Sequence, residues 1–104
     1  MPLDRERMSL LLDYYGSLIT RHQFDIMNQY FNEDYSMNEI AEEYMISKSA
    51  VQDLIKNTIN KLENYEKQIK SIDTDNKLRY ILDEMKQENS DILNKYIDKI
   101  EKVL

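Results

Sequence analysis

The residues best spaced for molecular recognition lie in one polar stretch near the middle of the chain. At helical spacing they share one exposed face, and the expected contact residues are Ser47, Lys48, Ser49, Gln52, Lys56 and Asn57. On a helix in a major groove, Gln52 can pair with adenine, while Lys48 and Lys56 can hold phosphates. Asp53 on this face opposes phosphate but can accept a hydrogen bond from cytosine. The alternative is a solvated or protein-binding face, with Lys56 paired to Gln52 or Asp53.

Catalytic and metal-binding chemistry has little support in the sequence. The chain has no Cys, which excludes disulfides, thiolate ligands and thiolate nucleophiles. Its one histidine, His22, has no nucleophile or second base placed beside it by a motif. Glu42 and Glu43 are adjacent in a predicted helix, so their side chains diverge. We therefore expect no enzymatic activity, no metal, no cofactor and no small-molecule substrate.

Composition favours an all-α protein. With 104 residues, the chain supports one compact domain and an appended helical hairpin. The chain has one Gly and one Pro, and so few of the residues that form the turns between the strands of a sheet. Glu, Lys, Leu, Met and Ile are abundant, which favours helices. There is no apolar run long enough to span a bilayer and no signal peptide. The expected protein is cytoplasmic, without membrane insertion.

Charge restricts how the chain can bind nucleic acid. The formal net charge is −6, and residues 1–47 hold nine Asp/Glu against three Lys/Arg. Nucleic-acid-binding domains are usually basic, because neutralising phosphates supplies most of their affinity. Lys48, Lys56 and Lys61, set against Asp53, give a local charge of +2. Binding to nucleic acid would therefore depend on this small patch.

The recognition stretch lies in a pattern typical of a helix-turn-helix, within residues 36–62. Ser36 and Glu39 form a capping box that opens a short amphipathic helix. Ser47 is the N-cap of the next helix. The expected buried residues are Ile40, Ala41 and Tyr44 on the first helix, and Val51, Leu54 and Ile55 on the second. This geometry places a reader helix across a support helix.

Two further helices precede this motif and are expected to cover it. Asp4 can cap a helix over residues 5–15, with Gly16 as its C-terminal stop. Thr20 and Gln23 form a capping box that opens a helix running to about residue 31. A domain over residues 1–70 would contain these helices and the helix-turn-helix.

The reader helix continues beyond its contact residues, to about residue 72. An apolar series with alternating spacings of four and three runs along it, which is typical of a heptad seam. We expect this seam to join two copies of the chain, through Ile55, Leu62, Tyr65, Ile69 and Ile72. An intrachain hairpin with residues 76–104 would bury the same stripe. The extension over residues 71–104 would pack or dimerise with the long helix, and we expect it to break into two helices at Asn89-Ser90.

Residues 18–62 resemble region 4 of bacterial sigma factors, through the Thr20 cap, the Ser36 entry and the serine that opens the reader helix. The chain as a whole resembles the YlxM-type helix-turn-helix proteins of low-GC bacteria. The matching segments are LLDYYGSLIT (11–20), YFNEDYSMNEIAEEYMISKSAVQDLIK (30–56) and NYEKQI (64–69). Met45 departs from the glycine common at the turn, which suggests a widened turn. Lys48 departs from the usual arginine and lacks its bidentate fork.

The resemblance carries functional expectations that the residue chemistry does not supply. Genes of this family typically accompany those of the signal recognition particle GTPase and its receptor. The resemblance therefore implies a regulatory or adaptor protein of that pathway, with the particle's RNA or GTPase as partner. The alternative is a sequence-specific DNA-binding transcription regulator.

Overall fold

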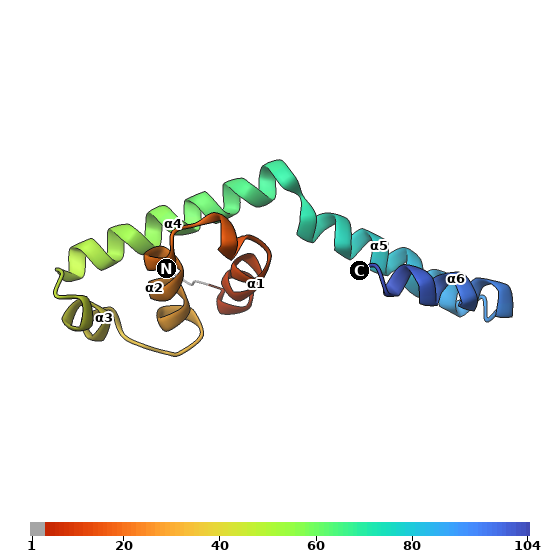
Figure 1. Cartoon of the computed structure of the whole chain (residues 1–104), viewed down its shortest axis with the longest axis horizontal. Helices are drawn as coiled ribbons and strands as arrows, with labels where there is room; N and C mark the ends of the chain where they lie inside the picture. Colours follow the sequence, from red (N-terminus) through yellow and green to blue (C-terminus); the bar gives the residue numbers. More distant parts are fainter. Residues whose placement is uncertain (1–3) are drawn as a thin grey trace. The chain divides into compact units, whose positions relative to one another are not determined.

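The computed structural model describes residues 4–104, and every regular element in that range is helical. The all-α prediction is confirmed. The chain divides into two compact units, one ending at Ile69 and the other running from Lys70 to Leu104. The first contains α1 to α4 and the second contains α5 and α6 (Figure 1).

The first two helices begin where the sequence predicts. α1 spans Arg5–Tyr15, and the Asp4 carboxylate accepts the Arg7 N–H at 3.1 Å. α2 spans Arg21–Phe31 and opens with the complete Thr20–Gln23 capping box. Each cap satisfies backbone donors that would otherwise lack a partner at the helix start.

Gly16 follows the last residue of α1, as the sequence predicts, but it is not in the left-handed conformation. Its φ is −59°, and the backbone continues into a short 3₁₀ turn, Gly16–Leu18. A Cβ at this position would lie 2.8 Å from the Phe24 ring. The glycine is therefore required for the close approach of the ring, and not for an unusual φ.

The predicted helix-turn-helix is present as α3, Met37–Tyr44, followed by α4, Lys48–Ile69. The Ser36–Glu39 capping box opens α3. The Ser47 hydroxyl oxygen accepts the Ala50 N–H at 3.0 Å and so caps α4. Ala41 is buried, as expected of a small residue where two helices approach closely.

The turn between α3 and α4 is tight, which corrects the prediction that Met45 widens it. Met45 adopts the left-handed conformation itself, with φ 54° and ψ 45°. Its N–H donates to the Glu42 carbonyl at 3.3 Å, and the Ile46 N–H donates to the Ala41 carbonyl at 3.0 Å. This pair of bonds is a Schellman motif, which a glycine usually completes. The hydrogen bonds of the turn hold the methionine in this conformation.

Replacing Met45 by glycine is expected to stabilise the first unit by about 0.5–1 kcal/mol, because glycine adopts this φ without steric cost. The side chain is 91% exposed, so no packing is lost. Urea unfolding followed by circular dichroism measures the change. Met45→Ala is the control, since it shortens the side chain but keeps the Cβ. A glycine variant no more stable than the alanine variant would show that this turn is not strained.

The core of the first unit lies between α4 and the three helices that pack along it (Figure 1). Four α4 residues are almost completely buried: Val51, Ile55, Thr58 and Leu62. Thr58 can occupy this apolar face because its hydroxyl donates to the Leu54 carbonyl at 2.7 Å. The heptad spacing in this part of α4 therefore reflects packing within the chain.

Hydrogen bonds and an ion pair join the second half of α4 to α1. The Tyr15 hydroxyl donates to the buried Glu66 carboxylate. The Arg7 guanidinium donates to both carboxylate oxygens of Glu63, at 3.2 and 2.9 Å. This hydrogen bonding to Glu63 raises the pKa of Arg7 above its ordinary value. Such bidentate pairing fixes geometry as well as charge.

The single helix predicted for residues 48–72 is wrong at its C-terminal end. α4 stops at Ile69, and Lys70 takes a left-handed φ of 61° before α5 begins at Ser71. The five predicted seam residues therefore do not form one exposed stripe. Ile55 and Leu62 are buried in the first unit, Ile69 is half exposed, and Ile72 is buried in α5. Tyr65 is half-buried and donates from its hydroxyl to the Leu18 carbonyl at 3.2 Å.

The second unit is a helical hairpin, with the predicted break at Asn89-Ser90. α5 spans Ser71–Gln87 and α6 spans Asp91–Glu101. Asn89 takes a left-handed φ of 49°, which only short polar residues and glycine adopt readily. Ser90 is the N-cap of α6, accepting the Leu93 N–H. α5 and α6 pack on each other within this unit.

Candidate nucleic-acid interface

The candidate interface is the exposed face of the first three turns of α4. Lys48, Gln52 and Lys56 follow one another at intervals of four residues and are exposed. The burial of Val51 and Ile55 fixes this orientation, because a helix with one face in the core must turn the other outward. The same packing makes Ser49, Asp53 and Asn57 exposed neighbours of the lysines. We call these six residues and Ser47 the reader face.

The lysines of the reader face are available for an external anion. Within residues 4–104, neither Lys48 nor Lys56 forms an ion pair, and the same is true of Lys61. The pairing of Lys56 with Gln52 or Asp53, considered from the sequence, is not present in this described range. An ammonium group without an internal ion pair binds a phosphate at a lower cost in free energy, because no existing ion pair has to be broken.

Ser47 differs from the other members of the reader face. Its oxygen accepts the Ala50 N–H and fixes the first turn of α4. Its O–H proton can still be donated to a phosphate or a carbonyl oxygen. The hydroxyl can therefore serve as a cap and as a contact, whereas the amides of Gln52 and Asn57 can both donate and accept toward a partner.

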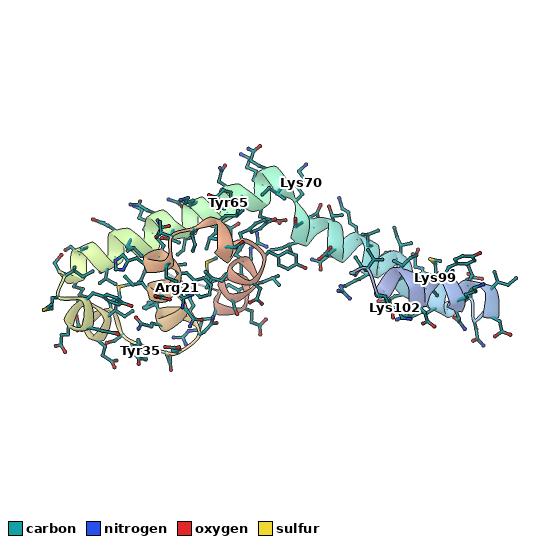
Figure 2. The ribbon with its side chains drawn as sticks, viewed as in Figure 1. Arg21, Tyr35, Tyr65, Lys70, Lys99 and Lys102 are labelled. Carbon is teal, nitrogen blue, oxygen red and sulfur yellow. The ribbon has the colours of Figure 1, made fainter. Side chains whose placement is uncertain are left out.

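A shallow depression of about 450 Å³ borders the reader face where α3 and α4 begin. Lys48 and Gln52 line it on the α4 side, and Asn38 lines it from the first turn of α3. Arg5 and Tyr35 also line it. Tyr35 lies on the connection between α2 and α3 (Figure 2). Arg5 was missed in the sequence analysis, because no local pattern links it to residues more than forty positions away.

The electrostatics of this depression are mixed. Arg5 forms an ion pair with Asp34, a residue held at a left-handed φ of 63°. The amide of Glu39 in the first turn of α3 already bonds to the Ser36 hydroxyl, and the Glu39 carboxylate returns to the Ser36 N–H. Lys48, unlike Arg5, forms no ion pair within residues 4–104 and is the positive group available at this edge. A phosphate there would be held mainly by Lys48.

The residues weighed for catalysis are not assembled into a site. His22 is exposed, and its ring lies nearly perpendicular to the ring of Tyr44, with the ring centres 5.2 Å apart. Burial is the main cause that raises the pKa of Tyr44. In the part of the chain that the structure describes, no group of three or more His, Cys, Asp or Glu residues is arranged to hold a metal ion. No helix of that part is long and apolar enough to cross a bilayer.

Comparison with known proteins agrees with this architecture. A family model described as "UPF0122: Putative helix-turn-helix protein, YlxM / p13 like" matches residues 3–103. A UPF0122 protein of Clostridium perfringens is 39% identical over 108 residues, which cover 97% of this chain and 96% of the relative. A UPF0122 protein of Shouchella clausii is 36% identical, over 93% of this chain and 94% of the relative. The chain therefore belongs to the UPF0122 family of YlxM/p13-like helix-turn-helix proteins.

Proposed function

We propose that this protein is a non-enzymatic regulatory or adaptor protein that binds nucleic acid through the reader face of α4. The observation that carries this proposal is the exposed row formed by Lys48, Gln52 and Lys56, in which both lysines lack ion pairs within residues 4–104. The two ammonium groups can contact phosphates of a nucleic-acid backbone, and the amide between them can contact the edge of a base.

We further propose the RNA of the signal recognition particle as the nucleic acid, with the particle's GTPase as the alternative partner in the same pathway. The support is the family relationship, since genes of YlxM-type proteins typically accompany those of the particle GTPase and its receptor. The charge distribution also favours a restricted target. Residues 1–69 hold twelve Asp/Glu against seven Lys/Arg, so a long uniform duplex would meet repulsion around the reader face.

The second candidate is a transcription regulator that reads duplex DNA. It is favoured by the arrangement of α3 and α4, which is the arrangement that presents a recognition helix to a major groove. In this case Gln52 would read adenine, and Asp53 would accept a hydrogen bond from cytosine. The protein would then prefer particular operator sequences to random duplex.

Fluorescence anisotropy of the whole chain at 50 and 200 mM salt tests these alternatives. The probes are the particle RNA, random duplex DNA and the labelled GTPase. We expect the RNA to bind most tightly and to lose about tenfold in affinity across this salt range, as two to three phosphate contacts require. Salt-sensitive binding to duplex DNA at equal or higher affinity would favour the transcription regulator. Binding to the GTPase alone would reject the nucleic-acid role and leave the adaptor role.

A further inference from the structure

The second unit buries few apolar side chains for its size. Residues 70–104 form two helices, and their buried apolar residues are Ile72, Leu82 and Ile97. Units of fewer than about 40 residues usually need a metal, disulfides or association to be stable. The chain has no Cys, and residues 4–104 hold no acidic or histidine cluster arranged for a metal. Association is the remaining way of covering apolar surface.

One flank of this hairpin is apolar. A groove of about 400 Å³ is lined by Leu78 of α5, by Tyr96, Lys99 and Ile100 of α6, and by Val103 and Leu104 beyond it. Lys99 contributes its aliphatic stem there, with its ammonium group 5.6 Å from the centre of the Tyr96 ring. At 100° per residue, Ile81 and Ile92 extend the same flank along the two antiparallel helices. All of these apolar side chains are at least 37% exposed.

The opposite flank is charged. It is lined by Arg79, Leu82, Asp83, Lys86 and Glu101, and an ion pair joins Lys86 of α5 to Glu101 of α6. Hydrogen bonding to Glu101 raises the pKa of Lys86 above its ordinary value, as expected for a closed ion pair. The hairpin thus has one charged flank that is readily solvated and one flank that exposes apolar side chains to water. Apolar patches of this kind on small proteins usually mark interaction sites.

We propose that the apolar flank binds the same flank of a second copy, so that two hairpins form a four-helix bundle with two-fold symmetry. Such an interface is self-complementary, and a four-helix bundle is the common way for two helical hairpins to enclose a core. The proposal concerns residues 70–104 and does not depend on the reader face. The proposed homodimer contact therefore lies on the hairpin, and not on the seam that the sequence predicts along the long helix.

The size of the flank is sufficient for a homodimer. Its seven large apolar side chains, on average about half exposed, present on the order of 600 Å² per copy. Two copies would bury on the order of 1,200 Å², the lower limit for specific protein interfaces. Charge does not oppose the association, since residues 70–104 hold eight Asp/Glu and seven Lys/Arg. By comparison, residues 1–69 are clearly acidic, and pairing two copies through that part would bring like charges together.

Sedimentation equilibrium of the full chain tests this proposal. We expect a mass twice that of the 12.6 kDa chain, with a concentration-dependent return to the monomer on dilution. A mass equal to the single chain up to ~0.1 mM, a Kd too weak for a specific dimer, would overturn it. That outcome would indicate that a different protein covers the flank.

Paired substitutions then assign the interface to this flank. Tyr96→Glu combined with Val103→Glu is expected to weaken dimerisation by about 30-fold or more, because charges would be buried in the contact. Both side chains are more than half exposed in the single chain, so the helices should persist, which circular dichroism verifies. Tyr80→Glu is the matched control, because Tyr80 is 68% exposed on the outer side of α5. A folded double variant that dimerises like the control would reject this interface.

Should the double variant lose helicity, Ile92→Glu provides a second test. Ile92 lies in the first turn of α6 and is 73% exposed, and an acidic residue is favourable at that end of a helix. The expected result is again weaker dimerisation with an unchanged helical spectrum. Dimerisation equal to that of the wild type would exclude the α6 side of the groove from the contact.

Discussion

Replacing Lys48 and Lys56 together by glutamate is expected to weaken RNA binding by about 100-fold at 50 mM salt. Each lysine is exposed and free of ion pairs inside residues 4–104, so each can hold a phosphate. A charge-assisted phosphate contact is worth about 1.5–3 kcal/mol, or at least tenfold in affinity. Anisotropy titration with the labelled particle RNA measures the loss.

The matched control for this experiment is Lys95→Glu combined with Lys102→Glu. It changes the net charge of the chain by the same amount, but both residues belong to the second unit and neither is part of the reader face. We expect the control to retain most of the wild-type affinity. Equal losses in the two double variants would show that binding responds to overall charge, and the reader face would then have no special role.

The salt dependence of the same variants separates phosphate contacts from base contacts. Removing two phosphate contacts should reduce the steepness of log affinity against log salt by about 1.5, which is most of the slope that a tenfold loss between 50 and 200 mM salt implies. Gln52→Ala should leave this slope unchanged while reducing the preference among sequences, because an amide contact to a base edge releases no counterion. A Gln52→Ala variant with an altered slope and an unaltered preference would contradict this placement of Gln52.

Replacing Leu62 by alanine is expected to destabilise the first unit by about 2–5 kcal/mol. Leu62 is 0% exposed and lies in the half of α4 that is fastened to the N-terminal helices. Loss of a buried leucine removes apolar contacts and leaves a cavity that the neighbouring helices fill only in part. Thermal and urea unfolding followed by circular dichroism at 222 nm measure the change.

Ile69→Ala is the control for Leu62, because both residues belong to the same predicted seam and Ile69 is 50% exposed. Its expected cost is below about 1 kcal/mol. The contrast distinguishes a core residue from an exposed contact residue. If the two variants were equally destabilised, Leu62 would not occupy the centre of the core. For the same reason, Leu62→Asp should unfold the first unit and cannot be used to test dimerisation.

Local features of the fold could be predicted because short-range chemistry fixes them. The Thr20–Gln23 and Ser36–Glu39 capping boxes each satisfy backbone donors within four residues, so they act whatever the rest of the chain does. The break at Asn89-Ser90 is local too, since asparagine tolerates a left-handed φ and serine caps the next helix. The helical type of each element and the starts of α1 to α4 and α6 were therefore available from the sequence, whereas the start of α5 at Ser71 was not.

The exposed residues of the candidate interface were also predictable, for a related reason. Once Val51 and Ile55 are assigned to the core, a period of 3.6 residues leaves Lys48, Gln52 and Lys56 on the outside. Arg5 and Asn38, which border the same surface, were not predictable. They reach it only because α1 and α3 pack against α4, and no sequence spacing encodes that arrangement.

The sequence by itself determined an all-α chain, its helix caps and the outward face of its reader helix, because these depend on contacts within a few residues. Only the tertiary structure decided what the apolar stripe of α4 contacts. A stripe on a helix must be buried, but its periodicity is the same whether the neighbour is another copy, another domain or the chain's own N-terminus. Ile55 and Leu62 are covered by helices of their own unit. The apolar surface left exposed instead lies on the hairpin of residues 70–104, where two helices are too few to enclose a core.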